Sequence, residues 1–403
     1  MYPKIQLKQG REKSLFYKHP WIFSGGLQIT GGKANATSEK IPDGSVVDIV
    51  TADGNFAARG YYNSLSNIAV RILTFDEKEM IDVEFFKRRI TKAWHMRHSL
   101  MNENGTNAYR VVFAESDELP GLIIDKYDEV LVMQIHTMGM DKLRPLVLEA
   151  LQSTLAPKAV YERSDVAARA QDGLTDKPEG NVFGFMPPTP LTISEHGLKY
   201  FVDVAWGQKT GFFLDQRENR FSLRKYTKDK TVLNLFCYTG GFTCSAFAGG
   251  ARSVTSVDIA EDAVQMCAKN VELNGFENAH TTVTADVFAY LDKAIADGTK
   301  FDIVVVDPPA FVKSQKNLDT ALKAYVRLNA MALRLLNDGG ILVSSSCSSY
   351  VSPEKFQGVL FHAGLKEKCV LKILEQKSQP LDHPVNLCFP EGEYLKFFVL
   401  QKN

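Results

Sequence analysis

A cysteine at position 347 lies among serines at the end of a predicted strand. Residues 341–346 are Ile-Leu-Val-Ser-Ser-Ser, and two more serines follow the cysteine. A thiol at the end of a strand is placed where a nucleophile could act, and the serines make its surroundings polar. Cysteine can also serve as a small apolar core residue, which suits Cys237, Cys244 and Cys267 better. Cys347 is therefore the candidate nucleophile.

A carboxylate followed by two prolines ends another apolar run, residues 301–306. Asp307 is followed by Pro308 and Pro309, and Phe311 comes two positions later. Prolines restrict the backbone and leave their own positions without an N–H donor. We therefore expect the Asp307 carboxylate and the Phe311 ring to face a ligand crevice.

A pair of glycines follows a third apolar run and precedes a stretch with helical spacing. Gly240 and Gly241 lie within VLNLFCYTGGFTCSAFAGGA, residues 232–251. This pattern predicts strand, glycine turn and helix, with a ligand lying directly on the backbone. Asp258, at the end of the next apolar run, could accept hydrogen bonds from both hydroxyls of a ribose. The stretch therefore predicts a nucleoside-binding site.

The glycine spacing distinguishes two classes of nucleoside ligand. A dinucleotide fingerprint, G-x-G-x-x-G, would supply further glycines to seat a pyrophosphate. Phe242, Thr243 and Cys244 stand there instead. Such a crowded turn favours a ligand with ribose and adenine but no phosphate, which indicates S-adenosylmethionine. The alternative is a glycine turn that only connects a strand to a helix.

The elements that would position these residues alternate regularly from residue 231 onward. Apolar runs and helical patterns follow one another, as in a parallel, doubly wound α/β sheet whose ligands bind beyond the carboxyl ends of the strands. We therefore predict a Rossmann-like domain over residues 191–403. Residues 164–190, rich in Asp, Gly and Pro, are expected to form a loop before it.

Two smaller domains are predicted ahead of this one. Residues 1–75 suggest a β-rich module, because Asp-Gly between alternating apolar residues is a hairpin signal and occurs at positions 53 and 54. Residues 76–190 suggest an α+β domain, with helices over 82–101 and 140–154 and short strands between and after them.

Cations and aromatic residues gather at two places in the first half of the chain. Trp21 and Phe23 could stack on RNA, or they could alternate as core residues of a strand. The predicted helix 82–101 carries five cations, and a solvated helix face is the favoured interpretation over an RNA-binding surface.

Composition limits the class of protein. The 403 residues exceed one ordinary core, and 47 basic side chains balance 47 acidic ones, which argues against a surface coated with positive charge for nucleic acid. Residues 1–75 nevertheless hold nine Lys and Arg against five Asp and Glu.

No apolar run is long enough for a membrane span and no signal sequence begins the chain, so a cytoplasmic protein is expected. The six cysteines show no zinc spacing, which predicts free thiols and no metal site.

These motifs, taken in order, resemble the ribosomal RNA large subunit methyltransferase I family. They are HPWIFSGG, the stretch 209–220, FCYTGGF, SVDIA, DPPAFVKS, SSCSS, DHPV and EGEYLKFF, and they run the length of the chain. The resemblance implies an N-terminal PUA RNA-binding domain, a central α+β domain and a class I methyltransferase domain. It also implies methylation at C5 of a cytosine in 23S ribosomal RNA, and a homodimer.

The resemblance implies a role for each reactive residue. C5 of cytosine is a poor nucleophile, so the thiolate of Cys347 would first add to C6. Asp307 would hydrogen-bond the N3 and N4 edge of the base and stabilise the adduct, while Phe311 could stack on a base taken out of its helix. The other implied substrate contacts are Pro308, Pro309, His383 and Trp21. For His383, the alternative to a contact with the base is a structural role.

The cofactor site is implied in the same way. The residues expected to bind S-adenosylmethionine are Lys209, Thr210 and Gln216 at its methionine end, and Phe236, Tyr238, Thr239, Gly240, Gly241, Asp258, Ile259, Asp286, Val287 and Asp307. Asp286 could accept a hydrogen bond from the adenine amine, or it could cap the helix that follows.

Three other functions fit parts of the pattern. An acid before Pro-Pro also suits methylation of an exocyclic amine, which needs no thiol. An assembly factor could bind RNA and the cofactor without turnover. A dehydrogenase is disfavoured by the glycine spacing.

Overall fold

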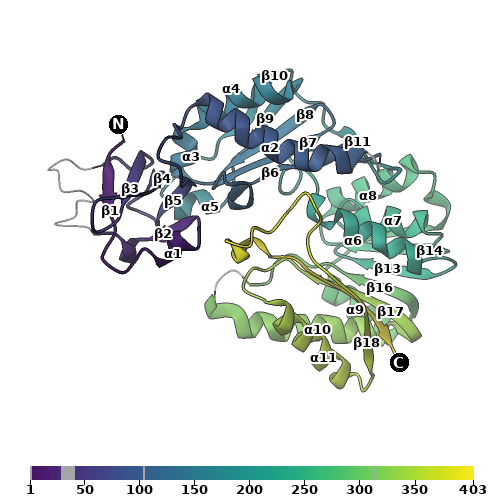
Figure 1. The fold of residues 1–403 in the computed structure, drawn as a ribbon. Helices are drawn as coiled ribbons and strands as arrows, with labels where there is room; N and C mark the ends of the chain where they lie inside the picture. Colours follow the sequence, from purple (N-terminus) through teal and green to yellow (C-terminus); the bar gives the residue numbers. More distant parts are fainter. Residues whose placement is uncertain (1, 29–40, 103–104, 313–314) are drawn as a thin grey trace. The chain divides into compact units, whose positions relative to one another are not determined.

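The computed structural model describes residues 2–28, 41–102, 105–312 and 315–403 (Figure 1). Its packing divides the chain into two compact units, each assembled from three segments. The first unit comprises Met1–Ile193, Val202–Leu214 and Leu381–Gly392, and the second Ser194–Phe201, Asp215–Pro380 and Glu393–Asn403. The division into domains at residues 75 and 190 stays a prediction.

The first part of unit one is a five-stranded sheet of order β1-β3-β4-β5-β2. Its strands are β1 (Lys4–Gln6), β2 (Trp21–Phe23), β3 (Val46–Val50), β4 (Phe56–Tyr62) and β5 (Ile68–Thr74), with the one-turn helix α1 (Lys13–Phe16) before β2. β3 and β4 pair antiparallel around Gly54, whose φ of 85° suits the hairpin turn. The predicted β-rich module and its hairpin are confirmed.

The central part of unit one is a second five-stranded sheet, of order β10-β9-β8-β7-β6, in which β10 is Glu179–Gly184. Its elements are α2 (Val83–Asn102), β6 (Ala108–Phe113), β7 (Leu122–Tyr127), β8 (Val130–Ile135), α3 (Met138–Lys142), α4 (Arg144–Leu155) and β9 (Ala159–Arg163). The helix predicted over 140–154 is thus two helices. Pro145 lies in the first turn of α4, where its missing N–H costs nothing but where it cannot continue the preceding helix.

The loop predicted over 164–190 is only partly a loop. It contains the short helix α5 (Ala168–Gln171) and the strand β10 (Glu179–Gly184), which pairs antiparallel with β9. β10 is the edge strand of its sheet and its side chains are mostly exposed. An edge strand with few buried side chains lacks the apolar alternation by which a strand is predicted from sequence. A two-stranded sheet, β11 (Leu191–Glu195) with β12 (Leu198–Val202), follows.

Unit two is built on a seven-stranded sheet of order β15-β14-β13-β16-β17-β19-β18. The strands are β13 (Thr231–Leu235), β14 (Ser253–Asp258), β15 (His280–Thr284), β16 (Phe301–Val306), β17 (Leu336–Ser346), β18 (Leu371–Lys377) and β19 (Lys396–Lys402). The first five are parallel, as predicted, and β19 runs antiparallel to both β17 and β18. The sheet is therefore mixed rather than wholly parallel.

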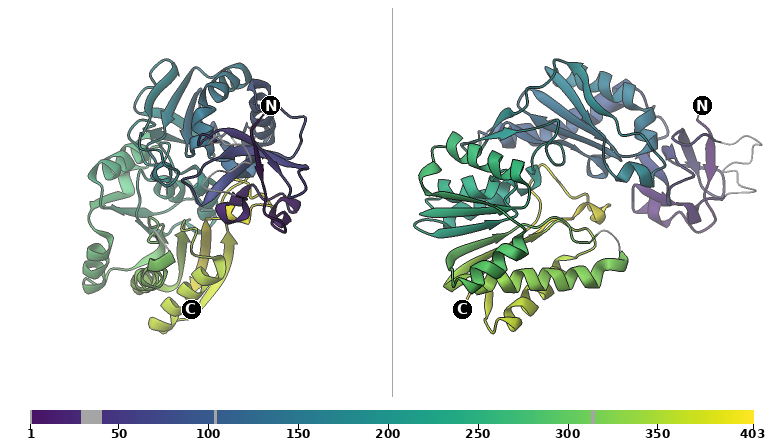
Figure 2. Two further views of the ribbon diagram at one scale, coloured as in Figure 1. Left: turned by 90° about the vertical axis from the view of Figure 1, so that its left-hand side faces the viewer. Right: turned by 180° about the vertical axis from the view of Figure 1, so that it is seen from behind.

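Helices cover both faces of this sheet (Figures 1 and 2). α6 (Arg217–Leu223), α7 (Gly241–Ala248) and α8 (Glu261–Leu273) lie over one face, and α9 (Val287–Ala296), α10 (Leu318–Arg334) and α11 (Pro353–Lys366) over the other. Between the layers, Val304, Val306 and Leu342 are buried in the core. This is the predicted α/β architecture, with the carboxyl ends of the parallel strands at one edge.

The cations of α2 do not form one solvated face. Arg97 is 1% exposed and pairs with Asp117 at 2.7 Å, and Arg89 contacts Glu79 at 3.3 Å. Lys92 does remain largely exposed. The expectation of a solvated face is wrong for the two arginines because acidic groups of the same unit pair with them.

Candidate active site

The predicted cofactor turn follows β13 and has an unusual backbone. Phe236, Tyr238 and Gly240 have φ angles of 59°, 48° and 86°. Left-handed conformations are costly for side chains with a Cβ, and they concentrate at functional sites. A Cβ on Gly240 would also come within 2.5 Å of the Cys267 Sγ. Glycine is therefore required at position 240 by both its dihedral angle and its neighbour.

The carboxylate of Asp258 is oriented by the backbone around it. Asp258 Oδ2 accepts from the Tyr238 N–H at 2.9 Å, and its Oδ1 accepts from the Ala260 N–H at 3.0 Å. Each oxygen keeps a second lone pair. The carboxylate is therefore pre-oriented at the end of β14 and able to accept two further hydrogen bonds, as binding of a ribose requires.

Two further polar groups complete the turn. The Asn270 Nδ2 donates to the Thr239 carbonyl at 2.8 Å and fixes the turn to α8. The Thr239 Oγ1 is buried and lacks a hydrogen-bond partner within the described residues. A buried hydroxyl without a partner is costly unless a ligand satisfies it. The residues of the turn thus fit a polar ligand with vicinal hydroxyls.

Asp286 caps the helix that follows it. Its Oδ1 accepts from the Ala289 N–H at 3.0 Å, at the N-terminus of α9. The capping interpretation is confirmed, and a second oxygen stays available for the adenine role, which remains a prediction. The Val287 side chain is buried in the core, so any contact of Val287 with a ligand would come from its backbone.

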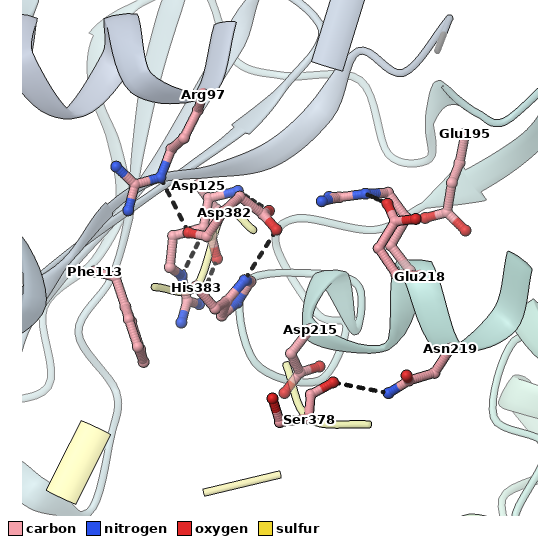
Figure 3. Close-up of polar contacts among 12 residues, drawn as sticks. Arg97, Phe113, Asp125, Glu195, Asp215, Glu218, Asn219, Ser378, Asp382 and His383 are labelled. Atoms are coloured by element: carbon pink, nitrogen blue, oxygen red, sulfur yellow. Dashed lines mark hydrogen bonds and ion pairs between the residues drawn. The ribbon is translucent and has the colours of Figure 1, made fainter. Parts of the chain in front are cut away.

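Asp307 is fixed by two side chains from other elements. The Gln216 Nε2 donates to Asp307 Oδ1 at 2.8 Å, and the Ser345 Oγ of β17 donates to the same oxygen. The Gln216 Oε1 in turn accepts from the Asn219 Nδ2 at 2.8 Å, and that amide also donates to the Ser378 carbonyl at 3.3 Å (Figure 3). The structure thus brings together Gln216 and Asp307 from the sequence prediction.

Ser345 and Asn219 were not singled out as site residues from the sequence. Ser345 is one of three serines that end β17, and all three are buried. Successive side chains of a strand point to opposite faces. The sequence offered one signal for this role, a run of serines at the end of an apolar strand. Which serine bonds Asp307 depends on how β17 pairs with β16, and the sequence does not show that pairing.

Cys347 follows β17 at the edge of the sheet where Asp307 follows β16. β16 and β17 are neighbouring parallel strands, with Val306 paired to Ser344, so the two predicted catalytic residues lie at adjacent strand ends. Cys347 is half-buried and free of a disulfide. A half-buried thiol next to polar groups remains accessible to a substrate.

The other predicted substrate residues of this loop lie against α10. The Phe311 ring centroid lies 4.6 Å from that of Tyr325, so one face of the ring is used for packing. Burial raises the pKa of Tyr325 to about 12, and the phenol therefore stays neutral. Stacking of Phe311 on a base, and contacts from Pro308 and Pro309, remain predictions. Lys313 and Ser314 of the DPPAFVKS motif lie outside the described residues.

Four predicted site residues belong to unit one: Trp21, Lys209, Thr210 and His383. The Thr210 Oγ1 donates to Asp125 Oδ2 at 2.6 Å and is fully buried. The Lys209 Nζ lies 4.5 Å from the Phe213 ring centroid. Their role at the cofactor remains a prediction.

Trp21 is not a core residue of its strand. The residue buried in β2 is Ile22, while Phe23 is 54% exposed and Trp21 is half-buried. The Trp21 Nε1 donates to Glu115 Oε1 at 2.8 Å, and its ring contacts Phe389 at 4.7 Å between centroids. The core interpretation of Trp21 and Phe23 is thus wrong because the register places their side chains on the other face. Stacking on RNA stays a prediction.

His383 lies in a tight structural network. Its ring packs 5.3 Å from that of Phe113. The neighbouring residue, Asp382, accepts from the Arg110 N–H at 2.9 Å, and its carbonyl accepts from the Arg97 Nε at 3.0 Å (Figure 3). These contacts support the structural interpretation of this segment, and a contact between His383 and a base remains a prediction.

All six cysteines are free, as predicted. Cys237, Cys244 and Cys267 are buried, and burial raises the pKa of the Cys244 thiol well above its usual range. These three are packing residues, in agreement with the sequence prediction.

Comparison with known proteins identifies the family. A profile of the S-adenosylmethionine-dependent methyltransferase family matches residues 172–388, and a PUA-like domain matches residues 5–75. Ribosomal RNA large subunit methyltransferase I of Klebsiella pneumoniae strain 342 is 43% identical over 399 residues, covering 99% of this chain and 98% of that protein. The chain belongs to the ribosomal RNA large subunit methyltransferase I family. The family member from Salmonella arizonae is 42% identical over 398 residues, covering 98% of this chain and 97% of that protein.

Solved structures share the fold over the whole chain. A protein from Streptococcus mutans described as an S-adenosylmethionine-dependent methyltransferase has a TM-score of 0.83, at 24% identity over 99% of this chain and 100% of its own. A methyltransferase complexed with SAH has a TM-score of 0.85 at the same identity and coverage. This family member is thus a methyltransferase whose cofactor is S-adenosylmethionine. In the described part of the chain, no helix is both long and apolar enough to cross a membrane.

Proposed function

We propose that this methyltransferase forms 5-methylcytosine in 23S ribosomal RNA through a covalent bond between Cys347 and C6 of the base. One observation carries the proposal. Cys347 is half-buried at the end of β17, and Asp307 lies at the end of the neighbouring strand β16. The names of its relatives, which are 42–43% identical, support ribosomal RNA of the large subunit as the substrate.

Cys347 supplies the nucleophile. Its thiolate adds to C6 of cytosine, which forms the S–C6 bond and moves an electron pair of the C5–C6 double bond toward C5 and the N3 edge. C5 then has the character of an enamine carbon. Once C5 carries the methyl group, a general base accepts the C5 proton, the electron pair of that C–H bond restores the C5–C6 double bond, and the Cys347 sulfur leaves as thiolate. When bound, S-adenosylmethionine supplies an electrophilic methyl group.

Asp307 recognises the base and stabilises the adduct. Addition of sulfur to C6 increases the electron density on the N3 side of the ring, and a carboxyl group there can hydrogen-bond N3 and the N4 amine. Since Gln216 and Ser345 both donate to Oδ1 of Asp307, this carboxyl group is fixed before the substrate binds. Pre-orientation of this kind lowers the cost of reaching the transition state.

The cofactor would be bound by the strained turn and the strand ends beside it. Asp258 would accept from the ribose hydroxyls, and the Thr239 hydroxyl would gain the partner that it lacks. Asp286 would accept from the adenine amine with the oxygen that does not cap α9. Lys209, Thr210 and Gln216 are proposed for the methionine end.

The remaining proposals concern the partner RNA and assembly. The PUA-like match over residues 5–75 supports an RNA-binding role for the first module, with Trp21 and Phe23 as stacking residues. The three-domain division and a homodimer are proposed on the same family relationship.

The function is tested by methyl transfer from labelled S-adenosylmethionine to 23S RNA that lacks the modification, followed by nucleoside analysis. We expect 5-methylcytosine with the wild-type protein and a loss of several orders of magnitude for Cys347→Ala, because the variant lacks the thiol that adds to C6. Cys388→Ala, which also removes a half-buried thiol, is the matched control and should retain activity.

Three outcomes would contradict the proposal. A methylated amine or a methylguanine would show that the base or the atom is wrong. A fully active Cys347→Ala would show that the reaction is not covalent. Binding of RNA and cofactor without any product would indicate an assembly factor rather than an enzyme.

A further inference from the structure

A lysine is buried beside the proposed nucleophile. Lys396 begins β19, opposite Ser346 of β17 in the antiparallel register, and Ser346 directly precedes Cys347. The Lys396 Nζ donates to the Ser348 carbonyl at 2.5 Å and to the Tyr394 carbonyl at 2.6 Å. The ammonium group is thus fixed to the backbone carbonyl of Ser348, the residue after Cys347, and to that of Tyr394.

This lysine is buried away from any paired carboxylate in the described part of the chain. Lys396 is 3% exposed, yet within the described residues it forms no ion pair with an acidic side chain. Arg220, another buried cation of unit two, pairs with Glu195 at 2.6 Å. A buried cation is costly unless an anion or several hydrogen bonds compensate it. The two carbonyls compensate Lys396 only in part, so an anion beside it would be stabilised.

Cys347 can provide this anion, and Glu393 is a second anionic group that acts on Lys396. Burial lowers the pKa of Lys396 to about 8, while the charges of Cys347 and Glu393 act to raise it. Below that pH the ammonium form predominates. The interaction energy of two charges is shared by both groups. If the Cys347 thiolate stabilises the Lys396 ammonium, the ammonium therefore stabilises the thiolate by the same amount.

Other charged and titratable groups lie near this pair. The Tyr325 hydroxyl of α10 accepts from the Ser346 Oγ at 3.1 Å and is neutral, and the charges of Cys347 and Asp307 both raise its pKa. Glu393 and Lys377 line a cavity of 360 Å³ together with Lys396. Of the two lysines of β19, Lys396 lies opposite Ser346, next to Cys347, and Lys402 lies at the other end of the strand.

We propose that Lys396 is a positioning residue whose ammonium group stabilises the thiolate of Cys347. The proposal rests on Cys347 as the nucleophile of the proposed function, but it concerns the free protein. The thiolate would then form before RNA and cofactor bind, so that addition to C6 needs no separate proton acceptor. Ordinary thiols have a pKa of about 8.5 and are mostly protonated at neutral pH.

The test is the rate at which iodoacetamide alkylates Cys347 as a function of pH, followed by peptide mass spectrometry without RNA or cofactor. In the wild type we expect the midpoint of the profile to lie below about 8.5. In Lys396→Met the midpoint should rise by about one unit, with a roughly tenfold slower reaction at pH 7. Lys396→Arg keeps the charge and should retain most of the wild-type midpoint.

Cys388, alkylated in the same samples, is the internal reference, and its profile should not change. A wild-type midpoint at or above about 8.5 would overturn the proposal even if Lys396→Met failed to fold. A folded Lys396→Met with the wild-type profile would overturn it too, as would an equal rise in Lys396→Arg. Because no methyl transfer is measured, this result is independent of which base or atom the enzyme methylates.

Discussion

Asp307 shows how a catalytic carboxyl group can be fixed by neighbouring side chains. Ser345 and Gln216 both donate to one oxygen of Asp307 and hold its carboxyl group in place. Removal of one donor would let the carboxyl group rotate about its side-chain bonds. A misplaced carboxyl group costs rate even when the substrate still binds.

We expect Ser345→Ala to lower kcat about tenfold with little change in RNA affinity, because it loosens Asp307 without touching the RNA. Its effect on the free energy of unfolding should be about 1 kcal/mol, the usual net value of one hydrogen bond. Steady-state kinetics and urea unfolding measure the two quantities.

Ser344→Ala is the matched control for this prediction. Ser344 is the preceding residue of β17, and its Oγ donates to Asn329 Oδ1 at 2.7 Å on the side of α10. The same atom is removed from a buried serine, so stability should fall to a similar extent while kcat stays unchanged. Equal losses of kcat in the two variants would show that the effect is structural.

At the scale of elements, the site depends on where strands end and helices begin. Asp258 ends β14, Asp307 follows β16 and Cys347 follows β17, and parallel strands bring these ends to one edge of the sheet. Asp286 lies at such a junction, because it directly precedes α9 and caps it. One residue can thus serve both the helix and the adenine ring.

Two substitutions of Asp286 separate these roles. Asp286→Ala should lower the free energy of unfolding by about 1 kcal/mol, because it removes the cap. Asp286→Ser keeps a capping oxygen and should retain stability, but its short side chain should not reach the adenine. We therefore expect a weaker Kd for S-adenosylmethionine in both variants, measured by calorimetry. An unchanged Kd in Asp286→Ser would leave Asp286 with the capping role alone.

At the scale of the whole chain, segments far apart in sequence are connected within unit one. Arg97 of α2 donates to Asp117 at 2.7 Å and to the carbonyl of Asp382 at 3.0 Å (Figure 3). The segment Leu381–Gly392 packs in unit one although the residues before and after it pack in unit two. Arg97 is thus a structural link between the central sheet and a late part of the chain.

We expect Arg97→Met to destabilise the protein by about 3–5 kcal/mol, because it leaves the Asp117 carboxylate buried and without its counter-ion. Lys92→Met, which changes an exposed cation on the same helix, should alter stability by no more than about 0.5 kcal/mol. Urea unfolding of both variants beside the wild type checks this. A loss below about 1 kcal/mol for Arg97→Met would mean that the ion pair contributes little net stability.

Local patterns in the sequence were sufficient for much of the fold and for the chemical types at the site. Apolar runs located four strands of unit two, β13, β14, β16 and β17, and the site residues after them were identified because those runs end there. The Asp53-Gly54 hairpin and the cap at Asp286 were also local signals. Such features depend on neighbours in the chain, which the sequence shows directly.

Contacts between residues distant in sequence were decided only by the tertiary structure. The edge strand β10 had no apolar pattern, and its pairing with β9 defined it. For Trp21 and Phe23 the sequence left a core role and RNA stacking open, and the core role failed because the register of a three-residue strand depends on its partner. Ser345 and Lys396 acquired their roles from Asp307 and Cys347, which lie on other segments. Burial and charge pairing arise when distant segments meet, so the chain alone specified which groups were available and the fold determined which of them act together.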